Sequence, residues 1–81
     1  MVDVELIPRF QKALSKMDHV ARIKVLKQIK KIKNNPEIGK PMMYARKGTR
    51  ELYIPPFRLS YACVYKENKI IFLDLYRKDE Q

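Results

Sequence analysis

The spacing of hydrophobic residues changes twice along the 81-residue chain, and each change predicts a new element. Over residues 2–7, Val2, Val4 and Leu6 alternate with Asp3 and Glu5, which is the period of a half-buried strand. A helical spacing then begins at Pro8, a residue that suits a first helical position. Its apolar positions are Phe10, Ala13, Leu14 and Met17. We therefore expect a strand followed by a short helix that ends near residue 17.

A second helix is predicted over residues 19–34, with Asp18 as its cap. Its apolar positions are Ile23, Leu26, Ile29 and Ile32, with Val25 alongside, and its opposite side carries Lys24, Lys27 and Lys31. No acid occurs between Asp18 and Glu37, so these lysines repel one another. They form either a solvated face or a surface for RNA or an acidic peptide. Asn34-Asn35-Pro36 ends the helix, and Gly39-Lys40-Pro41 predicts irregular structure after it.

The last third of the chain has the composition of strands and turns. Strands are predicted over residues 50–54, 57–66 and 69–76, with turns at Pro55-Pro56 and Glu67-Asn68. These strands form a three-stranded antiparallel meander, and the first strand of the chain completes a four-stranded sheet. The expected fold is therefore α+β, in one domain over residues 1–81.

The strand over residues 57–66 has two unlike faces. The period of two places Phe57, Leu59, Tyr61, Cys63 and Tyr65 on one face, which has the character of a core. The other face has small residues beside Arg58. That face leaves room for a ligand, unless a helix fills the space.

Arginine recurs on these apolar strands, at Arg50, Arg58 and Arg77. A guanidinium is always charged, and its desolvation is costly unless it meets an anion or a carboxylate. The three arginines therefore point to a phosphate-containing ligand. The formal net charge of +9 also indicates a polyanionic partner, with nucleic acid first and an acidic protein second; a merely solvated surface is the third interpretation.

Other features exclude several function classes. The chain has no long apolar run and no signal-peptide pattern at its start, so we expect a soluble cytoplasmic protein with no membrane partner. Cys63 is the only cysteine and His19 the only histidine, so we expect no metal site and no cofactor. Any catalysis must use other side chains.

The order of these segments resembles that of the RelE/ParE toxin superfamily of toxin–antitoxin systems. The residues that carry the resemblance are Asn34 to Pro41, the aromatic-Arg-Leu-x-Tyr strand at residues 57–61, and Arg77-Lys78 after the hydrophobic run of residues 70–76. The resemblance implies a microbial RNase fold, in which two helices pack on one face of a twisted antiparallel sheet and a basic cleft lies on the other. RelE-like toxins cut messenger RNA in the ribosomal decoding site, with the 2′-hydroxyl of the message as nucleophile. A cognate antitoxin silences them.

The resemblance also implies roles for residues of this sequence. Arg58 matches the strand arginine that contacts the scissile phosphate, and Arg77 or Lys78 matches a basic position for phosphate binding or leaving-group protonation. Where relatives often carry basic residues, this chain has Glu51 and Tyr53. Glu51 is then a candidate base or only an ion-pair partner of Arg50 or Arg58, and Tyr53 is a candidate acid, a stacking residue or a packing residue. Arg46, Lys47 and Arg50 are candidates for RNA binding, and Tyr76 is the nearest substitute for a C-terminal catalytic tyrosine of some relatives.

Three functions remain open at this point. The first is a ribosome-dependent endoribonuclease toxin, inhibited by an antitoxin. The second is a ParE-like toxin that inhibits DNA gyrase without catalysis, because one fold serves both functions. Glu51 and the short C-terminus favour this second function to some extent. The third is a basic nucleic-acid-binding module.

Overall fold

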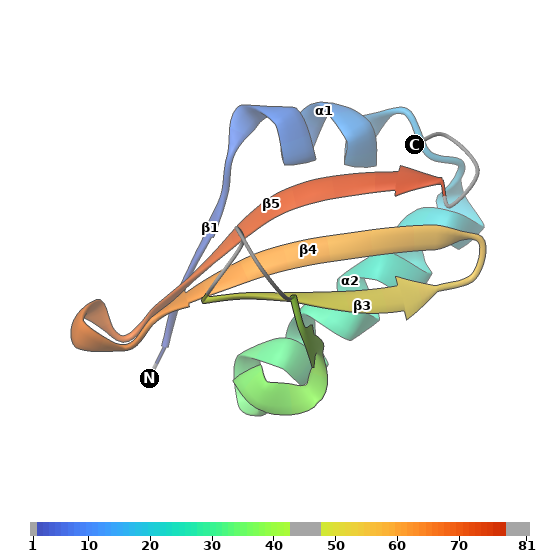
Figure 1. Ribbon diagram of the computed structural model, residues 1–81. Coiled ribbons are helices and arrows are strands. Elements are labelled where there is room, and N and C mark those ends of the chain that lie inside the picture. Colours follow the sequence, from blue (N-terminus) through green and yellow to red (C-terminus); the bar gives the residue numbers. More distant parts are fainter. Residues whose placement is uncertain (1, 43–47, 78–81) are drawn as a thin grey trace.

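The predicted order of strands and helices is confirmed in the computed structural model, which describes residues 2–42 and 48–77. The elements follow the chain as β1 (Asp3–Leu6), α1 (Pro8–Ser15), α2 (His19–Asn34), a 3₁₀ turn (Pro36–Ile38), β2 (Lys40–Pro41), β3 (Thr49–Ile54), β4 (Phe57–Val64), a second 3₁₀ turn (Tyr65–Glu67) and β5 (Lys69–Arg77). In Figure 1, α2 passes behind the sheet and α1 runs along the side of β5. The face of the sheet opposite α2 is called the open face below.

The sheet has one strand more than the sequence predicts. Its order is β1-β5-β4-β3-β2, in which β2 is a two-residue strand paired with β3. The sequence predicts irregular structure at Lys40-Pro41, so the prediction of four strands was wrong by this short edge strand. The predicted antiparallel meander is confirmed for β3, β4 and β5, whereas the antiparallel sheet that the resemblance implies does not extend to β1, which pairs with β5 in parallel, with Val4 opposite Ile70. Both helices lie between β1 and the rest of the sheet in the sequence, and a crossover of this length permits parallel pairing.

Local signals account for the limits of the helices. Pro8 opens α1, where its missing N–H would in any case have no partner in the helix. The Asp18 carboxylate caps α2, since its Oδ1 accepts a hydrogen bond of 2.8 Å from the backbone N–H of Ala21. The helix ends at Asn34, directly before Asn35 and Pro36. Asn68 adopts a left-handed conformation, with φ of 51°, at the turn into β5.

The buried side of α2 agrees with the predicted one only in part. Val25 and Ile32 are fully buried, whereas Ile23 and Leu26 are 39% and 47% exposed. Ile32 follows Val25 by seven residues, which is two helical turns, so these two side chains share the face that meets the sheet. Ile23 and Leu26 lie outside this face and were assigned to it by the three-residue spacing alone.

The core lies between the helices and the sheet face to which β4 contributes Leu59 and Tyr61. Phe10 of α1 packs against Phe72 of β5 with ring centroids 5.5 Å apart, and Tyr61 lies 5.8 Å from the same Phe72 ring. All three rings are fully buried. The predicted core face of β4 is therefore confirmed at these positions, although Tyr65 has left the strand and is 68% exposed.

The Tyr61 hydroxyl joins the centre of the sheet to the segment that follows α2. It donates a hydrogen bond of 2.7 Å to the carbonyl of Pro36 and accepts one of 2.9 Å from the N–H of Gly39. Gly39 has room for no side chain, because a Cβ there would lie 2.5 Å from the Tyr61 hydroxyl oxygen. The two hydrogen bonds thus fix the path of the chain from α2 into β2.

Tyr61→Phe should therefore lower the free energy of unfolding by about 1–3 kcal/mol, because it leaves the Pro36 carbonyl and the Gly39 N–H without their partner. Burial raises the pKa of Tyr61 above its ordinary value of 10.0. The folded state therefore favours the neutral phenol, so its contribution is complete below about pH 10 and is lost as the pH rises beyond that value. Urea denaturation at pH 7 and at pH 10.5 measures both effects. Equal stabilities of the two proteins at pH 7 would contradict the structural role.

Candidate functional site

The strand register gathers the candidate residues on the open face around Arg58. In β4, Arg58 lies directly opposite Tyr53 of β3 and opposite Tyr76 of β5. Residues directly opposite in an antiparallel pair point to the same face, so these three side chains form one row. The next row along the strands is Glu51, Ser60 and Asp74.

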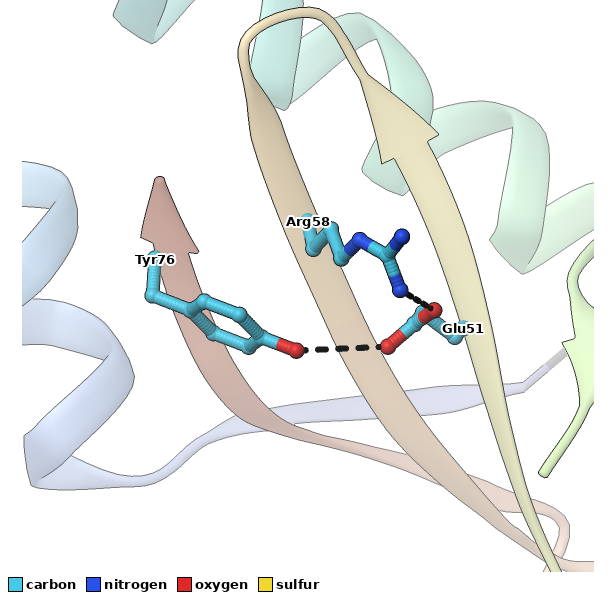
Figure 2. Close-up of polar contacts among 3 residues, drawn as sticks. All are labelled: Glu51, Arg58 and Tyr76. Carbon is cyan, nitrogen blue, oxygen red and sulfur yellow. Dashed lines mark hydrogen bonds and ion pairs between the residues drawn. The ribbon is translucent and has the colours of Figure 1, made fainter. Parts of the chain in front are cut away.

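Glu51 joins the two rows through its carboxylate. The guanidinium Nη1 of Arg58 donates a hydrogen bond of 2.8 Å to Glu51 Oε1, and the Tyr76 hydroxyl donates one of 3.3 Å to Glu51 Oε2. Figure 2 shows the three side chains in front of the sheet, each from a different strand. The side chains of Arg58 and Glu51 are 29% and 22% exposed, so water reaches this ion pair only in part.

Two polar atoms beneath this cluster have no hydrogen-bond partner within the described part of the chain. They are Nε of Arg58 and Oγ of Ser60, and both atoms are buried. Ser60 is 2% exposed as a whole residue. The sequence signal that places Ser60 opposite Glu51 is the two-residue length of the Pro55-Pro56 turn.

Asp74 is a second carboxylate of the open face that the sequence analysis missed. Its Oδ1 lies 3.1 Å from Nη1 of Arg9, which reaches it from α1. Arg58 and Arg9 thus each face a carboxylate. Between Arg9 and Lys33 the chain has nine lysines and arginines and one acid, Asp18, so most of the net charge of +9 lies on the helices.

Arg50 lies on the other face of the sheet and is not brought together with Arg58. It is opposite Tyr61 in the register, on the side of the core. Its Nη1 donates hydrogen bonds of 2.7 Å to the Gly39 carbonyl and 3.2 Å to the Glu37 carbonyl. These contacts give Arg50 a structural role beside Tyr61, and its binding of RNA stays a prediction.

Arg77 is also turned away from Arg58. It lies opposite Phe57, and its guanidinium carbon is 5.8 Å from the centroid of the Phe57 ring, a cation–π arrangement. The two residues line a groove of about 410 Å³ between the end of β5 and the α1–α2 connection, together with Lys16 and Met17. The pleat therefore separates the side chains of Arg50 and Arg77 from that of Arg58, and the prediction of a phosphate-containing ligand for the three arginines stays a prediction.

The remaining candidates divide into a described and an undescribed group. Tyr53 is 51% exposed beside Arg58, an accessible ring for stacking with a base. Arg46, Lys47 and Lys78 lie outside the described residues, so their roles stay predictions.

Among residues 2–42 and 48–77, no three His, Cys, Asp or Glu side chains are placed to hold a metal ion. No helix in those ranges is long and apolar enough to cross a membrane.

The cluster contains the chemical groups that cleavage of RNA by a 2′-hydroxyl requires. A carboxylate such as that of Glu51 is able to accept the proton of the hydroxyl, and a phenol such as that of Tyr76 is able to donate one. The planar fork of Arg58 suits two oxygens of a phosphate and stabilises the extra charge of the transition state. In this structure Glu51 accepts from both of the other groups, so the carboxylate stands where Arg58 would bind a phosphate oxygen.

Solved structures of RelE toxins match the fold of this chain over most of its length. The isolated RelE toxin of Escherichia coli has a TM-score of 0.85 at 13% identity, over 100% of this chain and 88% of its own. The RelBE2 toxin–antitoxin complex of Mycobacterium tuberculosis has a TM-score of 0.85 at 18% identity, over 95% and 98%. The chain has the RelE toxin fold.

A more distant RelE structure supports the same assignment of the fold. The archaeal RelE–RelB complex from Pyrococcus horikoshii has a TM-score of 0.72 at 16% identity, over 99% of this chain and 98% of its own. No protein-family model matches the sequence, and no curated protein matches it either. None of these three structures is of a ParE toxin, so they do not support the ParE part of the resemblance. At such low identity the RelE fold is shown, and function must be argued from the residues of the site.

Arg50→Ala should act on stability, because it removes the donor for two carbonyls at the end of the segment after α2. We expect the free energy of unfolding to fall by about 1–2 kcal/mol, while Arg50→Lys, which has no planar fork, recovers only part of that loss. Thermal or urea unfolding measures the change. Arg9→Ala serves as the control, since its ion pair with Asp74 is exposed and contributes little to stability. An unchanged stability of Arg50→Ala would contradict the structural role.

Proposed function

We propose that the protein is the toxin of a type II toxin–antitoxin pair and acts as a ribosome-dependent endoribonuclease on messenger RNA. The observation that carries the proposal is the cluster of Arg58, Glu51 and Tyr76 on the open face of a RelE fold. A fold without these groups would not support a reaction. The cluster supplies a cation, a base and an acid within contact of one another.

Arg58 has the central role in the proposed mechanism. It lies in the middle of the row formed with Tyr53 and Tyr76. Of the described strand arginines, Arg50, Arg58 and Arg77, it is the one whose side chain lies on the open face. Its guanidinium binds the scissile phosphate and stabilises the charge that develops on the phosphorane oxygens. Binding requires that its contact with Glu51 opens or is shared with the phosphate.

Glu51 and Tyr76 then supply the two proton transfers. Glu51 takes the proton of the attacking 2′-hydroxyl, and Tyr76 donates to the 5′-oxygen that leaves. Tyr53 stacks on a neighbouring base, because its ring is exposed in the same row. The 2′-hydroxyl, as nucleophile, belongs to the substrate, so the mechanism requires no metal ion and no cofactor.

An antitoxin is the second partner that we propose. The neighbours from Mycobacterium tuberculosis and Pyrococcus horikoshii were solved as complexes with their antitoxins. This chain carries its excess of lysines on the helices, so an acidic segment of the antitoxin would find complementary charge there. The ribosome is proposed as the partner that presents the message to the open face.

Arg58→Ala should lower the rate of message cleavage by about 10²–10³-fold, the usual effect of removing one preorganised donor to a transition-state oxyanion. The measurement is primer extension on messages from a translating cell extract, with and without ribosomes. Arg9→Ala is the matched control, because it removes an arginine of the same region that contacts Asp74. Intact message in the presence of the wild-type protein would contradict the proposal. Growth arrest without cleavage would then favour a non-enzymatic toxin, and salt-sensitive RNA binding without toxicity would favour a basic binding module.

A further inference from the structure

Ser60 is the residue of the open face whose chemistry the proposed mechanism leaves unexplained. Its hydroxyl is buried and has no hydrogen-bond partner within residues 2–42 and 48–77. An unpaired hydroxyl in the interior costs free energy, because water would satisfy it in the unfolded chain. Such atoms are rare in native proteins, and each requires a structural or functional explanation.

A second buried donor lies on the same face of the same strand. Ser60 follows Arg58 by two residues, so the pleat of β4 presents both side chains on the open face. Nε of Arg58 is likewise buried and unpartnered, while Nη1 of the same guanidinium contacts Glu51. The guanidinium thus has a buried Nε–H that makes no hydrogen bond. The Ser60 hydroxyl, which also makes none, lies next to it along the strand.

The position of Glu51 explains why these two donors lack an acceptor. Glu51 lies directly opposite Ser60 in the register. Its two carboxylate oxygens accept from Arg58 and from Tyr76. The carboxylate thus binds Nη1 of the guanidinium, and the two other donors, Nε of Arg58 and Oγ of Ser60, make no hydrogen bond within the described residues.

We propose that Ser60 Oγ and Arg58 Nε are a latent pair of donors for the phosphate of the RNA, which the Glu51–Arg58 ion pair keeps covered in the free protein. The inference rests on the proposed function and adds a residue and a regulatory contact to the same site. When a phosphate replaces Glu51 at Arg58, the guanidinium shifts and its Nε–H and the Ser60 hydroxyl both reach phosphate oxygens. Ser60 is then a binding residue for the phosphate, and Glu51 is a competitor for it.

This arrangement predicts opposite effects of one substitution on stability and on binding. Ser60→Ala removes an unpaired buried hydroxyl, so the midpoint of urea unfolding should rise. The same substitution removes a donor to a charged group, so affinity for RNA should fall about tenfold. Ser15→Ala is the matched control, because the Ser15 hydroxyl donates to the Lys12 carbonyl on α1 and lies outside the site.

The probe is a six-nucleotide RNA with 2′-O-methyl groups, which lacks the nucleophile and reports binding alone. Fluorescence anisotropy gives its dissociation constant for the wild type, Ser60→Ala, Ser15→Ala, Arg58→Ala and Glu51→Gln. We expect weaker binding for Ser60→Ala and Arg58→Ala, and tighter binding for Glu51→Gln, since an amide competes less well than a carboxylate for the guanidinium.

The outcomes separate this inference from the proposed function. If Ser60→Ala unfolds at lower urea and binds the probe as the wild type does, the hydroxyl has an internal partner and the inference is overturned. If Glu51→Gln does not bind more tightly, the covering contact is overturned. In either case a loss of binding in Arg58→Ala leaves the proposed function standing. If Arg58→Ala binds the probe as the wild type does, Arg58 is not a phosphate ligand in this complex and the inference is overturned, whereas the proposed function still depends on the cleavage assay with ribosomes.

Discussion

The pairing of β4 with a strand on each side is the constraint on which both the core and the candidate site depend. One set of its alternate side chains faces the core, and two of its members, Leu59 and Tyr61, are fully buried. The other set, which includes Arg58 and Ser60, must then lie on the open face. A shift of the register by one residue would exchange the two sets, placing a charged arginine in the core. Core packing therefore fixes the position of the candidate phosphate site.

The same alternation separates the charged residues into groups with different roles. Arg50 is on the core side, where two backbone carbonyls accept its hydrogen bonds, while Arg58 is on the open side and meets a carboxylate. On the open face, Glu51 balances the positive charge of Arg58 and Asp74 balances that of Arg9. The excess of lysines is on the helices. In the proposed function, long-range attraction of a polyanion and local contact with one phosphate would thus be tasks of different surfaces.

The sequence predicts the order of the elements and most of the core, because burial and period determine them locally. The period of two places Arg58 on the face opposite the core, whereas the faces of Arg50 and Arg77 require the registers of both hairpins. The register of β4 with β5 shifts between Ser60 and Tyr61, and no residue type in the sequence predicts this irregularity. The pairing of Glu51 with Arg58 was foreseen as one alternative, whereas the unpartnered hydroxyl of Ser60 follows only from atomic contacts.

The partial exposure of the Glu51–Arg58 ion pair determines how readily a phosphate can displace the Glu51 carboxylate from Arg58. A fully buried pair would be hard to open, because each separated charge would remain in a medium of low dielectric constant. An exposed pair contributes only about 0–1 kcal/mol and would scarcely compete with a phosphate. At 29% and 22% exposure this pair lies between the two limits. A phosphate held in place by further contacts is able to displace the carboxylate, whereas a loosely bound phosphate is at a disadvantage. In the proposed function, such a contact would favour RNA that another partner, such as the ribosome, has already positioned.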